Sequence, residues 1–396
     1  MRKLASIVEI ESVNPIEGAD KIEYVMMKGK GWRVVTSKGE FKPGDLAVYF
    51  EIDSALPADD PRYEFLKERC LKKFCTKGGE VLKQCIRIKT IRLRGIYSQG
   101  LVIPLEKFPE VTDNIVYDER LKRDVYIGSA TEDAEGQVVP ITEVVGADVT
   151  KRLGVEHYDE LVEALRPQLG GTVSGDAMGL FPSSWAPKTD EERIQNLADY
   201  FETMRDRTFQ VTVKSDGSSV TMFWSKTIDP ENPFGVCSRN LRLKPQKANG
   251  EMPLPWLMAK KYDVEAKLSK MTEGTSHEYA FQGELVGPGL QSNRDLLTEH
   301  EWQVFRIWDI TEQKFVSPPA AVDICKKLGI PHVTVLAEHV PVFQKFKNVD
   351  EILQFAEGKT ARGNEREGVV FKSDDANNEY VSFKAVSNRY LLKQKD

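Results

Sequence analysis

The 396-residue sequence has no apolar run long enough to cross a membrane. Its first residues, MRKLASIVEIES, contain no long hydrophobic stretch of the kind that secretory signals carry. Cysteine is scarce: five residues, an odd number in a long chain, favour reduced thiols over a disulfide framework. Together these absences lead us to expect an intracellular, cytoplasmic protein.

Metal-binding patterns of cysteine and histidine are also missing. Cys70, Cys75 and Cys85 lie near one another, but they have neither paired C-x2-C spacing nor an evident fourth ligand, which argues against structural zinc. The five histidines show no metal-ligand spacing. No internal repeat with a period of about 20–50 residues is present, so a solenoid or propeller is not expected.

An excess of positive charge is likewise absent. The formal net charge is −6, so the chain has no overall basic field for nucleic acid, and such a partner would have to be held by a local patch. The hydrophobic fraction of 40% and the charged fraction of 29% are those of an ordinary globular protein. The length allows two or three domains.

Residues 1–125 have the pattern of a small all-β domain. Short alternating segments are separated by turn signals such as Pro43-Gly-Asp45, which favours a five-stranded OB-like barrel that binds nucleic acid. The predicted strands are Leu4–Ile10, Tyr24–Met27, Arg33–Thr36, Leu46–Phe50, Gln84–Leu93 and Gly100–Ile103.

One segment of this domain, Lys83–Gly95, is basic and contains no acid. A bulge near Lys89–Thr90 would bring its cations onto one surface and keep its apolar residues inside. Such a strand could lie along a phosphate backbone, or it could be an ordinary solvated strand face, and the pattern leaves both open. The cations are Lys83, Arg87, Lys89, Arg92 and Arg94, and the apolar residues are Ile86, Ile88, Ile91 and Leu93.

Residues 126–175 are predicted to be a connector, and residues 176–396 a second domain of α+β class with mostly antiparallel strands. Three segments have helical spacing: Pro187–Phe201 with Thr189 or Asp190 as N-cap, Leu254–Lys270, and Pro318–Leu328. The later strands are predicted at Gly235–Leu243, Glu278–Gly289, Trp302–Ile310, Arg366–Ser373 and Glu379–Ser387.

The most informative stretch is FQVTVKSDGSSVTMFW, residues 209–224, in which two alternating segments flank a polar turn. This pattern predicts a β-hairpin with Lys214 at the end of its first strand. A lysine there could be a nucleophile if its surroundings lower its pKa, although Lys-x-Asp-Gly is also an ordinary hairpin turn.

The motifs that follow make the second domain resemble the covalent nucleotidyltransferases, the superfamily of ATP-dependent ligases and mRNA capping enzymes. The resemblance rests on ordered motifs over roughly residues 180–396. These are Lys214-Ser-Asp-Gly217, Ser238-Arg239-Asn240, Phe281-Gln-Gly-Glu284, Phe305-Arg-Ile-Trp-Asp309, Glu367-Gly-Val-Val-Phe-Lys372 and Ser382-Phe-Lys384.

Within the superfamily the chain is most similar to RNA ligases. PKTDEERIQN before the lysine, Gly287–Asn293, and the short tail after Lys384 are RNA-ligase-like. An N-terminal OB-like domain resembles the subfamily that seals nicks with a 3′-OH RNA strand. Val213 and Ser382 depart from the pattern, since relatives often have an acid before the nucleophile and a lysine at the first position of the last motif.

The resemblance implies an ATP-dependent RNA ligase for RNA repair. Lys214 would form lysyl-AMP, Lys384 and Lys372 would meet the α-phosphate, and Mg²⁺ (or Mn²⁺) with these two lysines would lower the pKa of Lys214. Asp216, Glu284 and Glu367 would hold the metal, partly through water. GTP-dependent capping, or a catalytically silent nucleic-acid-binding module, are the alternatives.

The remaining roles implied by the resemblance concern the nucleotide and the nucleic acid. Trp308 would stack on adenine and Val370 would cover its other face, with Glu284 also contacting the nucleotide. Arg239 would bridge the ribose and the 5′-phosphate of a nicked RNA-containing duplex. Arg87, Lys89, Arg92 and Arg94 would hold the strand beside the nick. Nothing in the sequence indicates an obligate dimer, so a monomer is expected.

Overall fold

The structure is a computed structural model that describes residues 3–76, 78–127, 142–165, 177–197, 200–291, 293–375 and 379–393. The chain divides into two compact units, residues 1–172 and 173–396. All five cysteines are free thiols. Within the described ranges, no helix has the length and apolarity needed to span a membrane.

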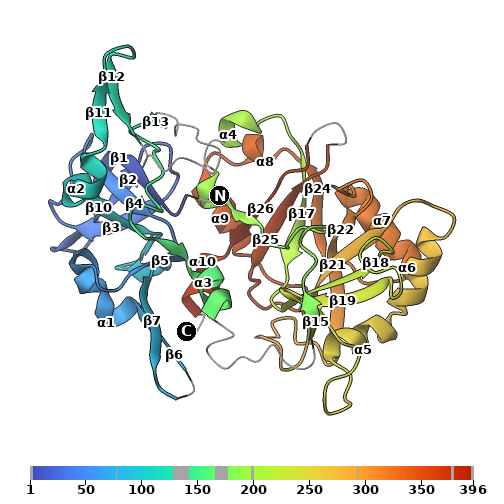
Figure 1. The fold of residues 1–396 in the computed structure, drawn as a ribbon. Helices are drawn as coiled ribbons and strands as arrows, with labels where there is room; N and C mark the ends of the chain where they lie inside the picture. The colour runs from blue at the N-terminus through green and yellow to red at the C-terminus, as the bar shows by residue number, and fades with distance from the viewer. Residues whose placement is uncertain are drawn as a thin grey trace. The chain divides into compact units, whose positions relative to one another are not determined.

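Unit 1 contains the all-β domain that the sequence predicts (Figure 1). Its five-stranded antiparallel sheet has the order β10-β4-β1-β2-β3, and a four-stranded sheet has the order β14-β5-β7-β6. Alternate residues of β2 and β3 are buried, as expected for strands with one covered face. The strands are β1 Ala5–Pro15, β2 Ile22–Met27, β3 Arg33–Ser37, β4 Leu46–Phe50, β5 Ser54–Pro57, β6 Leu71–Cys75, β7 Val81–Arg87, β10 Leu101–Pro104 and β14 Glu156–His157.

The predicted connector is in part a piece of unit 1. Ala147, Val149 and Leu153 are buried in the core of that unit, and Ile7 N donates to Ala147 O at 3.0 Å. Residues 142–165 therefore form part of the folded unit, because their apolar side chains pack against its core beside β1. They include β13 (Thr142–Glu143), which extends the hairpin of β11 (Ile115–Asp118) and β12 (Arg123–Tyr126), and α3 (Tyr158–Leu165). Residues 128–141 and 166–176 lie outside the described residues.

The basic segment differs from its prediction. Strand β7 ends at Arg87, and a separate two-stranded hairpin follows, made of β8 (Ile91–Leu93) and β9 (Ile96–Ser98). Arg94 and Gly95 turn this hairpin with φ of 47° and 87°, the left-handed pair that a tight turn between strands needs. The predicted bulge is thus wrong, and Ile91 is 38% exposed instead of inside, because β8 pairs with β9 and not with the barrel strands.

Unit 2 is built on two mainly antiparallel sheets, one of seven strands and one of five. Helices α5 to α7 pack on one face of the larger sheet, where Met258, Leu268 and Cys325 meet Met222 and Phe281 (Figure 1). The order of the larger sheet is β15-β20-β19-β18-β21-β22-β23. Its strands are β15 Ala177–Leu180, β18 Ser218–Trp224, β19 Phe234–Ser238, β20 Leu241–Leu243, β21 Tyr279–Val286, β22 Glu301–Asp309 and β23 Lys314–Phe315.

The smaller sheet has its own helix cover. Phe343 of α8 packs against Phe209 and Phe383, with ring centroids 5.7 and 5.6 Å apart. The order of this sheet is β16-β26-β25-β17-β24, from β16 Glu192–Arg193, β17 Phe209–Lys214, β24 Val335–Val340, β25 Gly368–Ser373 and β26 Ser382–Val386. The helices of its half are α4 Tyr200–Thr203, α8 Val342–Lys345, α9 Val349–Ala356 and α10 Asn388–Lys393.

The predicted hairpin at residues 209–224 is wrong. Both strands form, but β17 belongs to the smaller sheet and β18 to the larger one, so the turn after Lys214 crosses between sheets. Gly217 lies so close to β21 that an added Cβ would be 2.2 Å from the carbonyl oxygen of Leu285. Alternation within each strand predicted the strands correctly, but alternation carries no information about the pairing partner.

The helix predictions have mixed outcomes. Pro318–Leu328 is α7 as predicted, and Leu254–Lys270 forms two helices, α5 Leu254–Lys261 and α6 Val264–Thr272, broken by Asp263 at φ 49°. The helix expected at Pro187–Phe201 is wrong. Residues 187–191 are irregular and are followed by β16 and a short 3₁₀ turn, because polar contacts described below hold them extended.

The close approach at Gly217 gives a stability prediction. Gly217→Ala places a methyl group against backbone that cannot move freely, so we expect it to lower the free energy of unfolding by about 2 kcal/mol. Gly179→Ala is the matched control, because no atom lies within 4 Å of its Cβ position. Urea unfolding of both variants checks this, and equal effects at the two positions would contradict it.

Candidate active site

Lys214 lies on the polar face of the smaller sheet. It pairs in register with Gly368, while Val370 pairs with Lys384 and Lys372 with Ser382. Directly opposed residues of antiparallel strands share a face, so Lys214, Val370, Lys372 and Lys384 project to one side. The opposite side carries the apolar contacts with α8, which leaves the charged side for chemistry.

Carboxylates surround the amine of Lys214. Its Nζ lies 2.5 Å from Glu367 Oε1, and the side chain of Lys214 is 27% exposed. Burial lowers the pKa of Lys214, but Glu367, Glu284 and Asp216 together outweigh burial and raise the pKa above its ordinary value. The sequence-based expectation was that Mg²⁺ together with Lys372 and Lys384 would lower this pKa, and the protein groups without the metal raise it instead.

Glu284 shows how crowded the negative charge is. It lies on β21 of the larger sheet, and burial, together with Glu367 and Asp216, raises the pKa of its carboxyl to about 7. Lys214 and the backbone N–H of Gly217 act in the opposite direction. Asp216 of the crossing turn, Glu284 of β21 and Glu367, which precedes β25, are thus near enough to influence one another and Lys214 electrostatically.

Asp216 has both carboxylate oxygens occupied. Arg294 Nε donates to Oδ2 at 3.0 Å, and the hydroxyl of Tyr390 donates to Oδ1 at 3.0 Å. The Asp216 side chain is 7% exposed. The sequence gave no indication of either partner, because Arg294 lies in a loop and Tyr390 follows the last motif.

Asp216, Glu284 and Glu367 offer carboxylate oxygens to a possible metal ion. Oxygen ligands suit Mg²⁺ and Mn²⁺, and the raised pKa of Glu284 indicates a space in which a cation would be favourable. Among the described residues, no three His, Cys, Asp or Glu side chains stand close enough to chelate an ion together. The oxygen chemistry of these side chains thus suits a divalent ion, but they do not form a set that would chelate it directly.

Lys372 is buried, with 2% of its surface exposed, and its Nζ donates to the carbonyl oxygen of Phe305. This bond joins β25 to β22 and so links the two sheets. Burial lowers the pKa of Lys372 to about 7; Arg306 lowers it further and Glu191 opposes this. Lys372 shares the face of Lys214, but it is a weaker cation at neutral pH than the sequence suggested.

The segment at residues 187–191 bridges the two sheets. Arg306 of β22 donates to Glu191 Oε1 and to Lys188 O, both at 2.8 Å. Ser382 of β26 donates to the other oxygen of Glu191. Ser382, the departure from the family pattern, thus has a defined partner, and these partly buried bonds explain why the segment is not a helix.

The aromatic residues are placed as follows. Trp308 donates its indole N–H to Trp185 O at 2.8 Å, and its ring centroid lies 4.7 Å from that of Phe315. Phe305 is half-buried at a bulge where β22 passes β21, and its carbonyl reaches Lys372, two residues from Val370. Trp308, to which the sequence assigned the stacking role, and Phe305 lie in the same motif.

Arg239, in the turn after β19, pairs with Asp190 at 2.8 Å and keeps a 42% exposed side chain.

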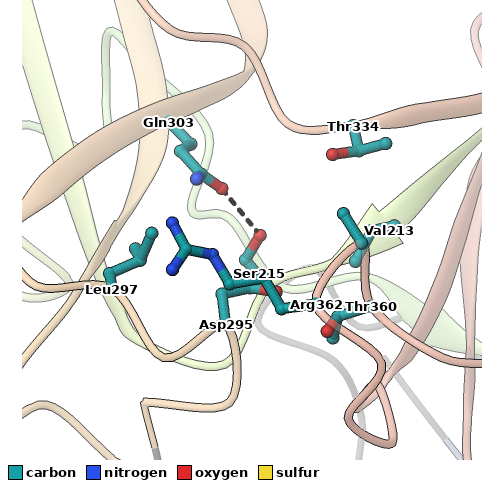
Figure 2. Close-up of a pocket in the computed structure, with 9 residues that line it drawn as sticks. Val213, Ser215, Asp295, Leu297, Gln303, Thr334, Thr360 and Arg362 are labelled. Carbon is teal, nitrogen blue, oxygen red and sulfur yellow. Dashed lines mark hydrogen bonds between the residues drawn. The ribbon is translucent and has the colours of Figure 1, made fainter.

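A cavity of about 140 Å³ lies beside Val213, the second residue that departs from the family pattern, on the side of β17 opposite to Lys214. Ser215 donates to Gln303 Oε1 at 3.1 Å at the edge of this cavity (Figure 2). Asp295, Thr360 and Arg362 also line it.

The predicted nucleic-acid-binding residues of unit 1 divide into two groups. Arg87 lies over the ring of Tyr158 at 4.2 Å and 3.8 Å from Asp53, and Lys83 forms an ion pair with Glu156, so acids accompany both cations. Arg92 and Arg94 are exposed on the β8–β9 hairpin, where Arg92 lies over Tyr97 at 5.4 Å. Lys89 is half-buried between the two groups.

A lysine with three acids around it and a second lysine on the same sheet face, in a chain whose first domain is all-β, are the features of a covalent nucleotidyltransferase with an N-terminal all-β domain. The profile of an OB-fold domain matches residues 4–105, and the RNA ligase profile matches residues 207–386. No curated protein matches the chain.

The similar solved structures agree with this class. A mutant of Naegleria gruberi RNA ligase with AMP and Mn is 31% identical over 99% of both chains, with a TM-score of 0.75. The same ligase with PPi is 32% identical over 100% of both chains, with a TM-score of 0.74. The chain belongs to the RNA ligase family and is an RNA ligase with an N-terminal OB-fold domain.

The buried lysine gives a pH-dependent prediction. The pKa of Lys372 is about 7 in the folded protein and 10.5 without burial, so the unfolded state binds more protons between these values. Holding Lys372 charged in the folded protein lowers the free energy of unfolding by its full amount below pH 7, and this loss of stability disappears as the pH rises to 10.5. Lys372→Met should raise the free energy of unfolding by about 2 kcal/mol at pH 6 and far less at pH 10.

Urea unfolding at the two pH values, followed by tryptophan fluorescence, measures this difference. Lys326→Met, on the exposed side of α7, is the control and should change little at either pH. A gain for Lys372→Met that is the same at both pH values would show that charge burial is not the cause.

Proposed function

We propose that this RNA ligase uses ATP to seal nicks with a 3′-OH RNA end and a 5′-phosphate, through lysyl-AMP at Lys214, and that it serves RNA repair inside the cell. The observation that supports this best is the Lys214 amine held 2.5 Å from Glu367 within three acids. Structures of Naegleria gruberi RNA ligase mutants that contain ATP and Mn, or AMP and Mn, support ATP and a divalent ion as the reactants to expect.

In the first step, neutral Lys214 Nζ would attack the α-phosphorus of ATP. A phosphorus–nitrogen bond forms, the bond between the α-phosphorus and the oxygen that bridges to the β-phosphate breaks, and pyrophosphate leaves, while the attacking nitrogen loses one proton to solvent. Lys384, whose register puts it on the same face of the sheet as Lys214, would be the cation that meets the α-phosphate, and Lys372 would be the second. The nucleic acid's 5′-phosphate then takes the AMP, and the 3′-OH displaces it.

Asp216, Glu284 and Glu367 are the proposed holders of the metal. A bound Mg²⁺ or Mn²⁺ supplies charge neutralisation at the phosphates and lowers the pKa of the neighbouring amine. Glu367 accepts a hydrogen bond from the Lys214 amine and would thereby orient the amine before it attacks. Because the acids raise the pKa of Lys214, lysyl-AMP formation should accelerate as the pH rises from 6 to 9.

The nucleic acid would meet Arg239 near the site and the exposed arginines of the β8–β9 hairpin in the OB domain. Arg239 has a half-exposed guanidinium with only an exposed acid, Asp190, as its partner, so a phosphate can compete for it. Arg92 and Arg94 are better placed for a phosphate backbone than Arg87, which is already near Asp53.

A labelling experiment tests the covalent step. The chain is incubated with Mg²⁺ and α-labelled ATP or GTP and then denatured. We expect acid-labile label from ATP, its loss in Lys214→Ala, and its retention in Lys226→Ala, a control lysine on the surface. Label from GTP alone would indicate capping, and no label from either nucleotide would indicate a silent module.

A panel of nicked duplexes then identifies the substrate. RNA on the 3′-OH side should be joined and DNA on that side should be joined poorly, whereas the 5′-phosphate side is expected to be less selective. Equal joining of all-DNA nicks would contradict the RNA-repair part of the proposal.

The aromatic partner of the purine is open to a direct test. Phe305, near Val370, is the residue we propose for stacking in place of Trp308, whose indole is engaged by Trp185 and Phe315. Phe305→Ala should raise the KM for ATP about tenfold, while Phe305→Tyr should leave it unchanged. A larger increase in the KM for ATP in Trp308→Phe than in Phe305→Ala would show that Trp308, and not Phe305, stacks on the purine.

A further inference from the structure

Asp216 is held from two directions by residues that none of the family motifs include. Arg294 Nε donates to Oδ2 and the Tyr390 hydroxyl donates to Oδ1, each at 3.0 Å. A carboxylate with one accepted bond on each oxygen cannot rotate without losing both. Each oxygen still has a second lone pair, which faces away from its donor and can accept a further hydrogen bond.

The two donors also hold each other. The guanidinium of Arg294 lies over the Tyr390 ring at 4.3 Å, and Asn364 Nδ2 donates to Arg294 O at 2.6 Å. Helix α10, which carries Tyr390, is tied down by Arg389 at 3.1 Å from Glu357 and by Lys393 at 2.5 Å from Glu365. The orientation of Asp216 therefore depends on a loop and on the last helix of the described chain.

The loop that carries Arg294 has an unusual backbone. Gln291, Asn293 and Leu296 have φ of 43°, 39° and 47°, a region that residues other than glycine rarely adopt. Asn293 bonds to both backbone groups of Leu297, and Arg362 donates to Leu296 O at 3.1 Å. Such strain is kept where the surrounding structure enforces it, and here it delivers Arg294 to Asp216.

We propose that Arg294 and Tyr390 are positioning residues that act through Asp216, fixing its free lone pairs toward the waters of the divalent ion. This inference rests on the proposed function, because it assigns the ion to the same acids. Partners that orient metal-binding carboxylates commonly change metal affinity about tenfold or more when they are removed.

The test measures metal binding by the full chain without turnover. Tyr390→Phe keeps the ring under Arg294 and removes one hydroxyl, and Arg294→Lys keeps the charge but loses the planar fork. Mn²⁺ is titrated into each protein, and the free ion is followed by electron paramagnetic resonance. We expect both variants to bind Mn²⁺ about tenfold more weakly. The Mn²⁺ concentration for half-maximal lysyl-AMP should rise by the same factor.

Leu392→Ala is the control, because Leu392 lies on the same helix with a side chain that is 40% exposed and takes no part in holding Asp216. It should leave Mn²⁺ binding unchanged, and unfolding curves establish that every variant is folded. Unchanged or tighter Mn²⁺ binding in folded Tyr390→Phe and Arg294→Lys overturns the inference, as does a full chain that binds no Mn²⁺. A full chain that binds Mn²⁺ but forms no lysyl-AMP overturns the proposed function alone.

Discussion

The contact between Lys214 and Glu367 is the interaction on which the rest of unit 2 depends. It holds an amine 2.5 Å from a carboxylate, on a strand whose other side packs into an apolar core. The turn at residues 215–217 carries Asp216 from one sheet to the other and brings Glu284 alongside. Glycine at 217 permits this, because the turn lies against the backbone of β21.

Gathering three acids in a partly buried space costs free energy, which the raised pKa of Glu284 reflects. The structure offsets that cost with fixed donors. Lys214 lies at Glu367, while Arg294 and Tyr390 lie at Asp216, and the strained loop and α10 hold these donors in place. Fully partnered polar networks of this kind specify one arrangement of the elements around them.

A second network, around Glu191, explains why the segment before β17 is not the helix that its sequence predicts. The residues of PKTDEERIQN have helical spacing, yet Arg306 and Ser382 bind Glu191 from different sheets and keep the segment extended. Helical propensity is a weak preference, and these partly buried hydrogen bonds, each with a charged partner, outweigh it. Similarly, Ile91 has a strand pattern but lies exposed, because its hairpin pairs only with itself.

What the sequence determined by itself was local and ordered along the chain: the alternating strands, α7, the all-β first domain, and the motifs that identify an RNA ligase. Strand alternation and motif order survive folding because they depend on neighbouring residues. Only the tertiary structure decided that β17 and β18 lie in different sheets, that Lys372 is buried beneath Phe305, and that Arg294 and Tyr390 meet Asp216. Those facts depend on residues up to 174 positions apart in the chain, and no local pattern encodes such a contact.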